Sequence, residues 1–173
     1  ASGNAYGIQV GDAAGNIENS GNISANADSN ARGIYVDGTL TAAIKNNGTD
    51  TSDGIRDGIF VGTDEAPTYA EGIYVDTIGD GGSITNIGII DAIAVASSIS
   101  AEATAYGINV GTLESGGSIT NSGTIKAEAY AYSSTSYSSY SISATATAYG
   151  IHVGDVAGNI ENSGNISANA DSN

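Results

Sequence analysis

The sequence contains no cysteine, no methionine, no tryptophan and only one proline, Pro67. Without cysteine, the chain has no disulfide framework, no cysteine-based metal site and no thiol catalysis. Four lysines and arginines stand against 19 aspartates and glutamates, which gives a formal net charge of −15. Because nucleic acids and anionic lipids are bound through cationic side chains, we expect neither of them as a partner.

Long apolar runs are also missing. No run approaches the roughly 20 residues that cross a bilayer, so we expect no membrane insertion, and no signal peptide is recognisable. Apolar residues do not recur with the period of a helix, and glycine and β-branched residues dominate, so long helices are not expected. Methionine is absent even from position 1, from which we expect a processed or excised piece of a longer protein.

What the sequence does contain is one unit that recurs along the chain. It is clearest in residues 106–125, YGINVGTLESGGSITNSGTI. The unit joins Gly-Ile-x-Val to a glycine-rich turn and then to Ile-x-Asn-x-Gly, usually followed by x-Ile. Copies start at Gly7, Gly33, Gly72, Gly107 and Gly150. A sixth Gly-Ile-x-Val, at residues 58–61, has no clear Asn-x-Gly partner.

The spacing within the unit predicts three short strands and three corners. In Gly-Ile-x-Val the apolar residues alternate, so isoleucine and valine point to one side of a strand and x points to the other. One such rung cannot bury its apolar residues alone, whereas rungs stacked about 4.8 Å apart bury them in common columns and pair their backbones. We therefore predict an all-β protein, a parallel β-helix (β-solenoid) of about five to six rungs.

An asparagine recurs at one corner of the unit. Its copies are Asn19, Asn46, Asn86, Asn121 and Asn162. We favour a structural ladder, in which the side-chain amides of successive rungs hydrogen-bond along the helix axis. The alternative is a row of amides that binds a ligand.

Two segments interrupt the pattern of an otherwise single solenoid domain over residues 1–173. Residues 49–69 are predicted to form an irregular acidic insertion whose one good strand is the Gly-Ile-Phe-Val at 58–61. Residues 126–148 are rich in tyrosine and serine, and we predict a projection there. A third side that lengthens from rung to rung is not expected to pair along its whole length.

The two ends of the chain have nearly the same sequence. Residues 4–30 and 147–173 differ at only three positions. One interpretation is a duplication within a long repetitive protein. Another concerns assembly, because the ends of a β-helix are open strand edges, and open edges pair. Copies stacked head to tail through two end rungs of the same shape would form an open filament.

The corner segments carry a family resemblance. They are ITNSGTI (119–125), IENSGNI (17–23 and 160–166) and, as a weaker copy, ITNIGII (84–90). Joined to Gly-Ile-x-Val strands, they resemble the β-helical passenger repeats of bacterial autotransporters and related large surface adhesins. The resemblance covers nearly the whole chain except residues 49–69. It implies a right-handed helix and a secreted, bacterial cell-surface protein used for adhesion, aggregation or structural display.

Enzymatic chemistry is not expected. His152 is the only histidine, and it takes an outward position where the duplicate rung has Gln9, so a surface role is favoured over that of a catalytic base. The carboxylates lie mainly in turns, and no second domain supplies the opposite wall of a cleft such as glycoside hydrolysis uses.

Calcium is the one cofactor that the sequence suggests. Calcium takes six to eight oxygen ligands, often from flexible turns, and acidic residues cluster among glycines in the predicted insertion. The candidate ligands are Asp50, Asp53, Asp57, Asp64 and Glu65. Their spacing matches neither an EF-hand nor the glycine-rich nonapeptide calcium repeat. The alternative is a set of solvated acidic turns.

Three aromatic residues occupy the x position of Gly-Ile-x-Val, namely Tyr35, Phe60 and Tyr74. We predict that they align as an exposed face, which could contact sugar rings or a partner protein. Stacking between rungs is the structural alternative. Our leading interpretation is a non-enzymatic extracellular structural protein that assembles with copies of itself. The second is an adhesin that binds a glycan or a host protein through this aromatic face.

Overall fold

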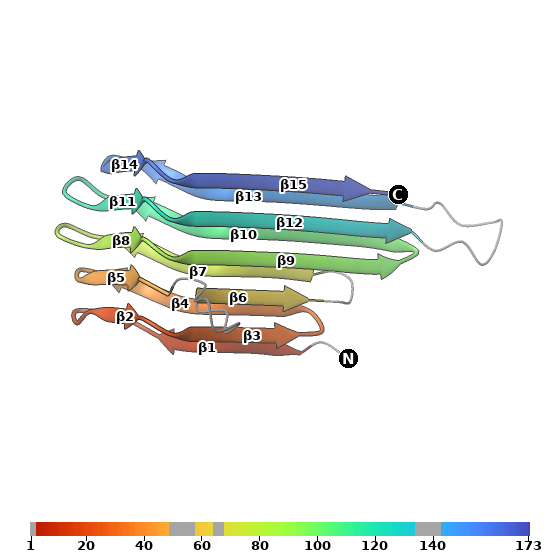
Figure 1. Cartoon of the computed structure of the whole chain (residues 1–173), viewed down its shortest axis with the longest axis horizontal. Helices are drawn as coiled ribbons and strands as arrows, with labels where there is room; N and C mark the ends of the chain where they lie inside the picture. Colours follow the sequence, from red (N-terminus) through yellow and green to blue (C-terminus); the bar gives the residue numbers. More distant parts are fainter. Residues whose placement is uncertain (1–2, 49–57, 64–67, 134–142) are drawn as a thin grey trace.

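The computed structural model describes residues 3–48, 58–63, 68–133 and 143–173. These residues form fifteen strands and no helix, and the strands wind into five stacked rungs (Figure 1). Each rung contributes one strand to each of three five-stranded sheets, and neighbouring rungs pair in parallel. The protein is therefore a parallel β-helix, which confirms the predicted fold class.

The three sheets, here named A, B and C, follow one another around every rung. Sheet A contains β1 (Asn4–Val10), β4 (Asn30–Leu40), β7 (Thr68–Ile78), β10 (Ser100–Leu113) and β13 (Ser143–Val156). Sheet B contains β2 (Ile17–Asn19), β5 (Ala43–Asn46), β8 (Ser83–Asn86), β11 (Ser118–Asn121) and β14 (Asn159–Asn162). Sheet C contains β3 (Asn22–Ala27), β6 (Gly58–Thr63), β9 (Ile89–Ser98), β12 (Thr124–Ser133) and β15 (Asn165–Ser172).

The register between rungs stacks equivalent residues of the unit in columns. In sheet B, for example, Ile44 pairs with Ile84, and Ile84 pairs with Ile119. All three side chains are fully buried. The column arises because β-strand side chains alternate with a period of two, so a slip of one residue would turn every isoleucine outward.

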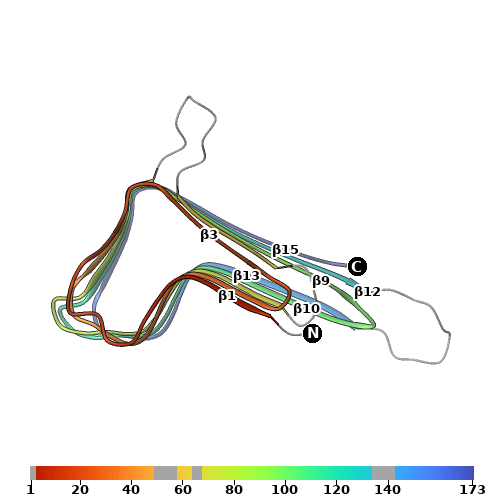
Figure 2. The ribbon, with the colours of Figure 1, turned by 90° about the horizontal axis from the view of Figure 1, so that it is seen from below.

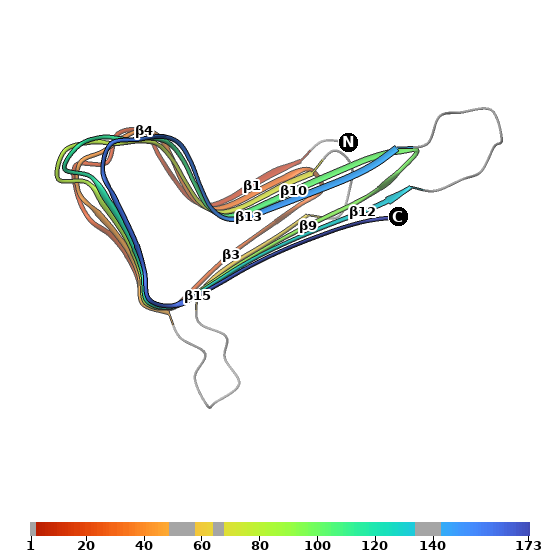
Figure 3. The ribbon, with the colours of Figure 1, turned by 90° about the horizontal axis from the view of Figure 1, so that it is seen from above.

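Seen along the helix axis, each rung has a wide part and a narrow part (Figures 2 and 3). The strands of sheet A bend partway along their length. Beyond the bend they enclose the wide part together with sheet B, and before it they run alongside sheet C. Isoleucine, valine and leucine fill the wide part, where three sheets face one another. One hydrophobic core runs through the stack.

Alanine lines the narrow part between sheets A and C. In the fourth rung, the buried alanines are Ala101, Ala103 and Ala105 of β10 and Ala127, Ala129 and Ala131 of β12. Their side chains are at most 1% exposed. A methyl group on each face allows two sheets to approach more closely than the roughly 10 Å of ordinary stacked sheets, so this part of the core is thin.

The long strands of sheets A and C pair with those of the neighbouring rung, contrary to the prediction of a projection over residues 126–148. Residues 124–133 of β12 pair with residues 89–98 of β9, and residues 100–113 of β10 pair with residues 143–156 of β13. The prediction was wrong for residues 126–133 and 143–148, because sheets A and C lengthen together and bury each other's alanines. Residues 134–142 lie outside the described residues.

The Gly-Ile-Phe-Val of residues 58–61 belongs to a different column from the other five copies. It forms most of β6, the third side of the second rung. Ile59 pairs with Ile23 and Ile90 of sheet C. Within the predicted insertion, residues 58–63 are thus a regular strand and residues 68–69 begin β7. Residues 49–57 and 64–67 lie outside the described residues.

Candidate functional site

In each strand of sheet A, the glycine of Gly-Ile-x-Val follows the alanine positions of the narrow part and precedes the isoleucine and valine of the wide part, so we assign the bend to it. A Cβ atom added to Gly72 would lie 2.3 Å from Cγ2 of Ile90 in sheet C and 2.5 Å from the carbonyl oxygen of Gly107 in the next rung. Each of the equivalent glycines likewise has the isoleucine of sheet C within 2.1 to 2.4 Å of such a Cβ: Gly7, Gly33, Gly107 and Gly150. The close approach of the two sheets therefore requires glycine at the bend.

The outer surface of this bend carries two columns of side chains, which we call the bend face. One column holds the residues that precede the glycine: Tyr6, Arg32, Glu71, Tyr106 and Tyr149. The other holds the residues two positions after it: Gln9, Tyr35, Tyr74, Asn109 and His152. The bend face brings polar and aromatic side chains of all five rungs together, and we take it as the first candidate site.

Three tyrosines form a stack in the N-terminal half of the bend face. The ring centroid of Tyr35 lies 5.3 Å from that of Tyr6 and 5.1 Å from that of Tyr74. The guanidinium carbon of Arg32 lies 4.6 Å from the Tyr35 centroid and within 6 Å of the other two centroids. Such contacts of a cation with aromatic rings are attractive.

Phe60 does not join this stack, which corrects the predicted set of aromatic residues. Tyr35 and Tyr74 are neighbours as expected, but Phe60 lies in sheet C, where it pairs with Ser24 and Asp91. The error follows from the reassignment of β6, because its Gly-Ile-Phe-Val belongs to the third side of a rung rather than to the first. The third ring of the stack comes from Tyr6, which precedes the glycine of the first rung.

The C-terminal half of the bend face contains a second aromatic group. The rings of Tyr106 and Tyr149 are stacked, with centroids 5.2 Å apart and an angle of 9° between their planes. The imidazole of His152 lies 5.5 Å from the first ring and 5.0 Å from the second. One side of the His152 ring therefore contacts both tyrosine rings.

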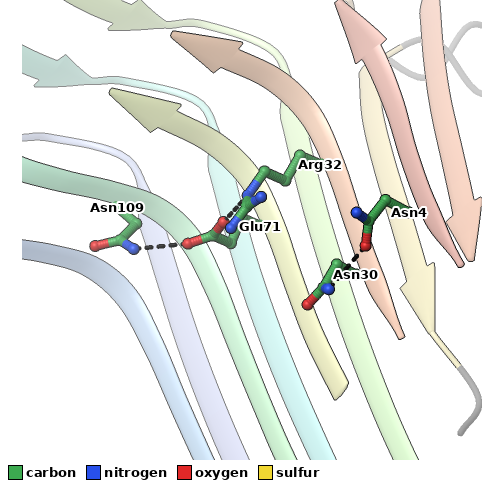
Figure 4. A network of polar contacts seen from close by, with 5 residues as sticks. All are labelled: Asn4, Asn30, Arg32, Glu71 and Asn109. Carbon is green, nitrogen blue, oxygen red and sulfur yellow. Dashed lines mark hydrogen bonds and ion pairs between the residues drawn. The ribbon is translucent and has the colours of Figure 1, made fainter. Parts of the chain in front are cut away.

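A buried carboxylate connects the two halves (Figure 4). Glu71 is 3% exposed, and one of its oxygens accepts a hydrogen bond and ion pair from Nε of Arg32. Its other oxygen accepts a hydrogen bond of 2.7 Å from Nδ2 of Asn109. Figure 4 also shows Asn30 donating to Asn4 at 2.8 Å. A buried carboxylate is costly unless it is paired and hydrogen-bonded, and Glu71 has both kinds of partner.

The same chain of hydrogen bonds assigns the tautomer of His152. Nδ2 of Asn109 donates to Glu71, so Oδ1 of Asn109 is left as an acceptor. It lies 2.9 Å from Nδ1 of His152. The proton of that contact must therefore sit on Nδ1, and the polar chain runs from His152 through Asn109 to Glu71, where it meets Arg32.

The electrostatics of the bend face favour its present protonation states. Burial alone would lower the pKa of the Arg32 guanidinium, but the hydrogen bond and the charge of Glu71 outweigh it and raise that pKa above its ordinary value. The pKa of Tyr74 is raised by burial first and then by Asp76 and Glu71. Burial also raises the pKa of Tyr106. Arg32 therefore stays charged and the two phenols stay neutral over a wider range of pH.

Sequence reasoning missed the members of the bend face that precede the glycine. Arg32 and Glu71 are 39 residues apart, and no local pattern links an arginine to a glutamate at that distance. An alignment of the five units on their glycines would have found them, because it places Tyr, Arg, Glu, Tyr and Tyr in one register position.

The aromatic rings of the bend face contact one another from rung to rung. Tyr35 has a tyrosine ring on each side along the helix axis and a guanidinium near its centroid. The two neighbouring rings are tilted by 31° and 36° against it, and the Tyr35 side chain is partly exposed. Tyr35 and Tyr74 thus make the contact between rungs that the structural alternative describes, and their role in binding a partner stays a prediction.

The corner asparagines form a continuous row of hydrogen bonds. In each step Nδ2 donates to Oδ1 of the next rung, at 2.7 to 2.8 Å, in the order Asn19, Asn46, Asn86, Asn121 and Asn162. The three central asparagines are fully buried, and their amides also donate to backbone carbonyls. Since these amides are buried and have protein partners, the row acts as a structural ladder rather than as a ligand-binding surface.

The predicted calcium ligands Asp50, Asp53, Asp57, Asp64 and Glu65 all lie outside the described residues. Within the described ranges, no group of three or more histidine, aspartate or glutamate side chains is arranged to hold a metal ion.

The second candidate site is the pair of end rungs. In the fifth rung Ile160 is 42% exposed and Ile166 is 41% exposed. Their equivalents one rung below, Ile119 and Ile125, are fully buried. Within the described residues no helix covers either end of the stack. The fifth rung thus presents the apolar columns of the core, and the edges of three sheets, to whatever lies beyond it.

The end rungs also carry polar groups that serve contacts with a further rung. In the first rung, the side chains of Asp12 and Asn16 accept hydrogen bonds from the backbone of the second, from N of Thr39 at 2.8 Å and from N of Ala43 at 3.1 Å. The duplicate sequence gives the fifth rung the same two acceptors, Asp155 and Asn159. The side chains of Asp155 and Asn159 can therefore each accept a hydrogen bond from a backbone N–H of a further rung.

In comparisons with known proteins, no family model, no curated protein and no solved structure matches this chain. Within the described residues, no helix has the length and apolar character needed to cross a bilayer.

Proposed function

We propose that this chain is a non-enzymatic structural segment of an extracellular fibre at a bacterial cell surface, and that copies of it stack head to tail through their end rungs. The observation that carries the proposal is that the fifth rung leaves its core columns exposed and has nearly the sequence of the first. The extracellular, bacterial setting rests on the resemblance of the Ile-x-Asn-x-Gly repeats to autotransporter passengers and large adhesins.

The contacts between consecutive rungs inside the solenoid predict those at the joint between copies. Stacked in the usual register, the fifth rung of one copy sets Ile160 over Ile17 and Ile166 over Ile23 of the next. Nδ2 of Asn162, which donates only to the carbonyl of Gly164 in its own rung, would continue the ladder. Burial of exposed apolar surface at about 25 cal/mol per Å² and pairing of three open edges both favour association.

Aromatic stacking extends across the same joint. Tyr149 is the last ring of the second aromatic group and is 39% exposed. Tyr6 is the first ring of the other group. Head-to-tail stacking places these two tyrosines in consecutive rungs of one column, so the bend face becomes continuous along the fibre.

The experiment is a mixing test with two variants of the full chain. Ile166→Asp places a charge on the C-terminal end, and Ile23→Asp places one on the N-terminal end. In 500 mM sodium chloride, sedimentation velocity should show concentration-dependent polymers for the native chain and monomers for each variant alone. An equimolar mixture should give dimers and nothing longer, because each dimer joins the one intact end of each variant.

The matched control is Ile87→Asp, at a position that is 53% exposed on the side of the stack. It should polymerise like the native chain, and circular dichroism should show unchanged strand content in all variants. A native chain that stays monomeric at every concentration, or a mixture of the two end variants that stays monomeric, would refute head-to-tail stacking.

A further inference from the structure

We infer that repulsion between carboxylates at the joint controls the stacking of copies. The repulsion opposes association at neutral pH and low salt, and acid, salt or one lysine substitution relieves it. This inference rests on the proposed head-to-tail stacking and concerns its regulation. The reason is the duplication itself: when two rungs of nearly identical sequence meet in register, each acidic side chain faces its own duplicate.

The clearest case is one column of sheet B. From the first rung to the fifth its members are Glu18, Lys45, Thr85, Thr120 and Glu161. Inside the solenoid, Nζ of Lys45 lies 3.2 Å from a carboxylate oxygen of Glu18, so the first two rungs meet through an ion pair. At the joint, Glu161 would face Glu18 of the next copy instead.

The groups around this contact do not neutralise it. Within its own copy, Glu161 pairs with the uncharged Thr120 of the fourth rung. In the next copy, Glu18 already has Lys45 of the second rung as its partner. Two carboxylates about 4.8 Å apart, the spacing of neighbouring strands, would therefore share one ammonium group at the joint.

Two further columns repeat the arrangement. Asp155 of sheet A, which pairs with the uncharged Thr112 in the rung below, would accept a backbone N–H of the next copy, as Asp12 does from Thr39. It would also bring its charge beside the carboxylate of Asp12. Asp171 of sheet C, which pairs with Tyr130, would lie in one column with Asp28 of the next copy. His152 would face Gln9. Acidic groups thus meet acidic groups in three columns, on a chain whose net charge is already −15.

The direction of the pH and salt effects follows. At pH 7.5 carboxylates are ionised, and at low salt their repulsion is weakly screened, so association is opposed. Near pH 4 carboxyl groups gain protons, the repulsion falls, and a protonated carboxyl can donate a hydrogen bond to its neighbour. At 0.5 M salt the Debye length is only several ångströms, so the same repulsion is largely screened at pH 7.5.

A charge reversal at the joint isolates the cause. Glu161→Lys would reproduce, across the joint, the lysine-over-glutamate contact that Lys45 makes inside the stack. Asp76→Lys is the matched control, because it makes the same change in net charge at an exposed residue of the third rung. Both variants change the net charge by two, from −15 to −13.

The test is sedimentation velocity on the full chain at pH 7.5 in 10 mM and in 500 mM sodium chloride, and at pH 4. At pH 7.5 in 10 mM salt, Glu161→Lys should associate about tenfold more tightly than the native chain, and Asp76→Lys should stay within about twofold of it. The native chain should gain in association at high salt and at pH 4, and Glu161→Lys should gain much less from salt.

Three distinguishable outcomes would contradict this electrostatic control. Equal gains for the two lysine variants would mean that net charge, and not the joint, sets the association. A native chain that polymerises equally at all three conditions would keep the head-to-tail stacking and remove its electrostatic control. Monomers under every condition, with both variants and the native chain, would remove the stacking itself.

Discussion

Removal of one amide from the middle of the asparagine ladder should destabilise the solenoid strongly. In Asn86→Ala, Nδ2 of Asn46 loses its acceptor at 2.8 Å, and Oδ1 of Asn121 loses its donor at 2.7 Å. Both partners are fully buried. One N–H of Asn46 and the oxygen of Asn121 would then be unpaired, although Nδ2 of Asn46 keeps its bond to the carbonyl of Ile89. A buried polar group left unpaired costs about 1–3 kcal/mol, so two such groups should lower the free energy of unfolding by about 2–6 kcal/mol.

A change at the end of the ladder provides the matched control. Asn162 is exposed and accepts only one ladder bond, from Asn121. Water can replace that acceptor at the open end, so Asn162→Ala should cost less than about 1 kcal/mol. Asn86→Asp should cost at least as much as Asn86→Ala, because a carboxylate can accept from Asn46 but cannot donate to the next rung.

The assay is equilibrium unfolding in guanidinium chloride, followed by far-ultraviolet circular dichroism for the native chain and the three variants. The midpoint should fall for both changes at position 86 and hardly move for Asn162→Ala. If Asn86→Ala and Asn162→Ala shift the midpoint equally, the ladder would not act through buried hydrogen bonds, and the reasoning above would be wrong.

Three other predictions concern the bend. Gly72→Ala should destabilise the chain by about 1–3 kcal/mol or more, because the new methyl group overlaps packed neighbours. Gly21→Ala, where an added Cβ meets nothing within 4 Å, should cost far less in the same denaturation assay. Arg32→Met should cost about 3 kcal/mol, because it leaves the carboxylate of Glu71 without its cation, and Glu71→Gln in that background should restore part of the loss. Above about pH 10 the stability should fall, because the pKa of Tyr106 is raised in the folded state and only the unfolded chain gives up that proton readily. Thermal midpoints measured from pH 8 to pH 11 test this, and Tyr106→Phe should flatten the decline.

The ladder and the bend face differ in how far the sequence predicts them. Asn86 and its equivalents repeat with the corner glycine, so their alignment follows from the repeat as soon as the fold is a solenoid. The partnership of Arg32 with Glu71 has no such signal. It exists because consecutive rungs place position 32 beside position 71, and a salt bridge needs the two side chains within about 4 Å in space, whatever their distance along the chain.

Phe60 shows why a strong local motif can still be assigned to the wrong side of a rung. Gly-Ile-Phe-Val has the same alternation as the five other copies, and alternation reports only that a strand has one buried face. Which sheet that strand joins depends on where the chain stands in its turn around the rung, and residues 49–57 separate it from the corner before it. Its pairing with β3 and β9 decides the question.

The amino-acid sequence alone therefore determined the rung, its corners, the asparagine ladder and the near identity of the two ends, because each depends on local alternation and on exact repetition. Only the tertiary structure decided the bend of sheet A, the thin alanine layer that lets long sides pair, and the network centred on Glu71. Those features arise between side chains that are a full rung apart or on facing sheets. Their contacts depend on how closely the sheets approach, which no spacing along the chain specifies.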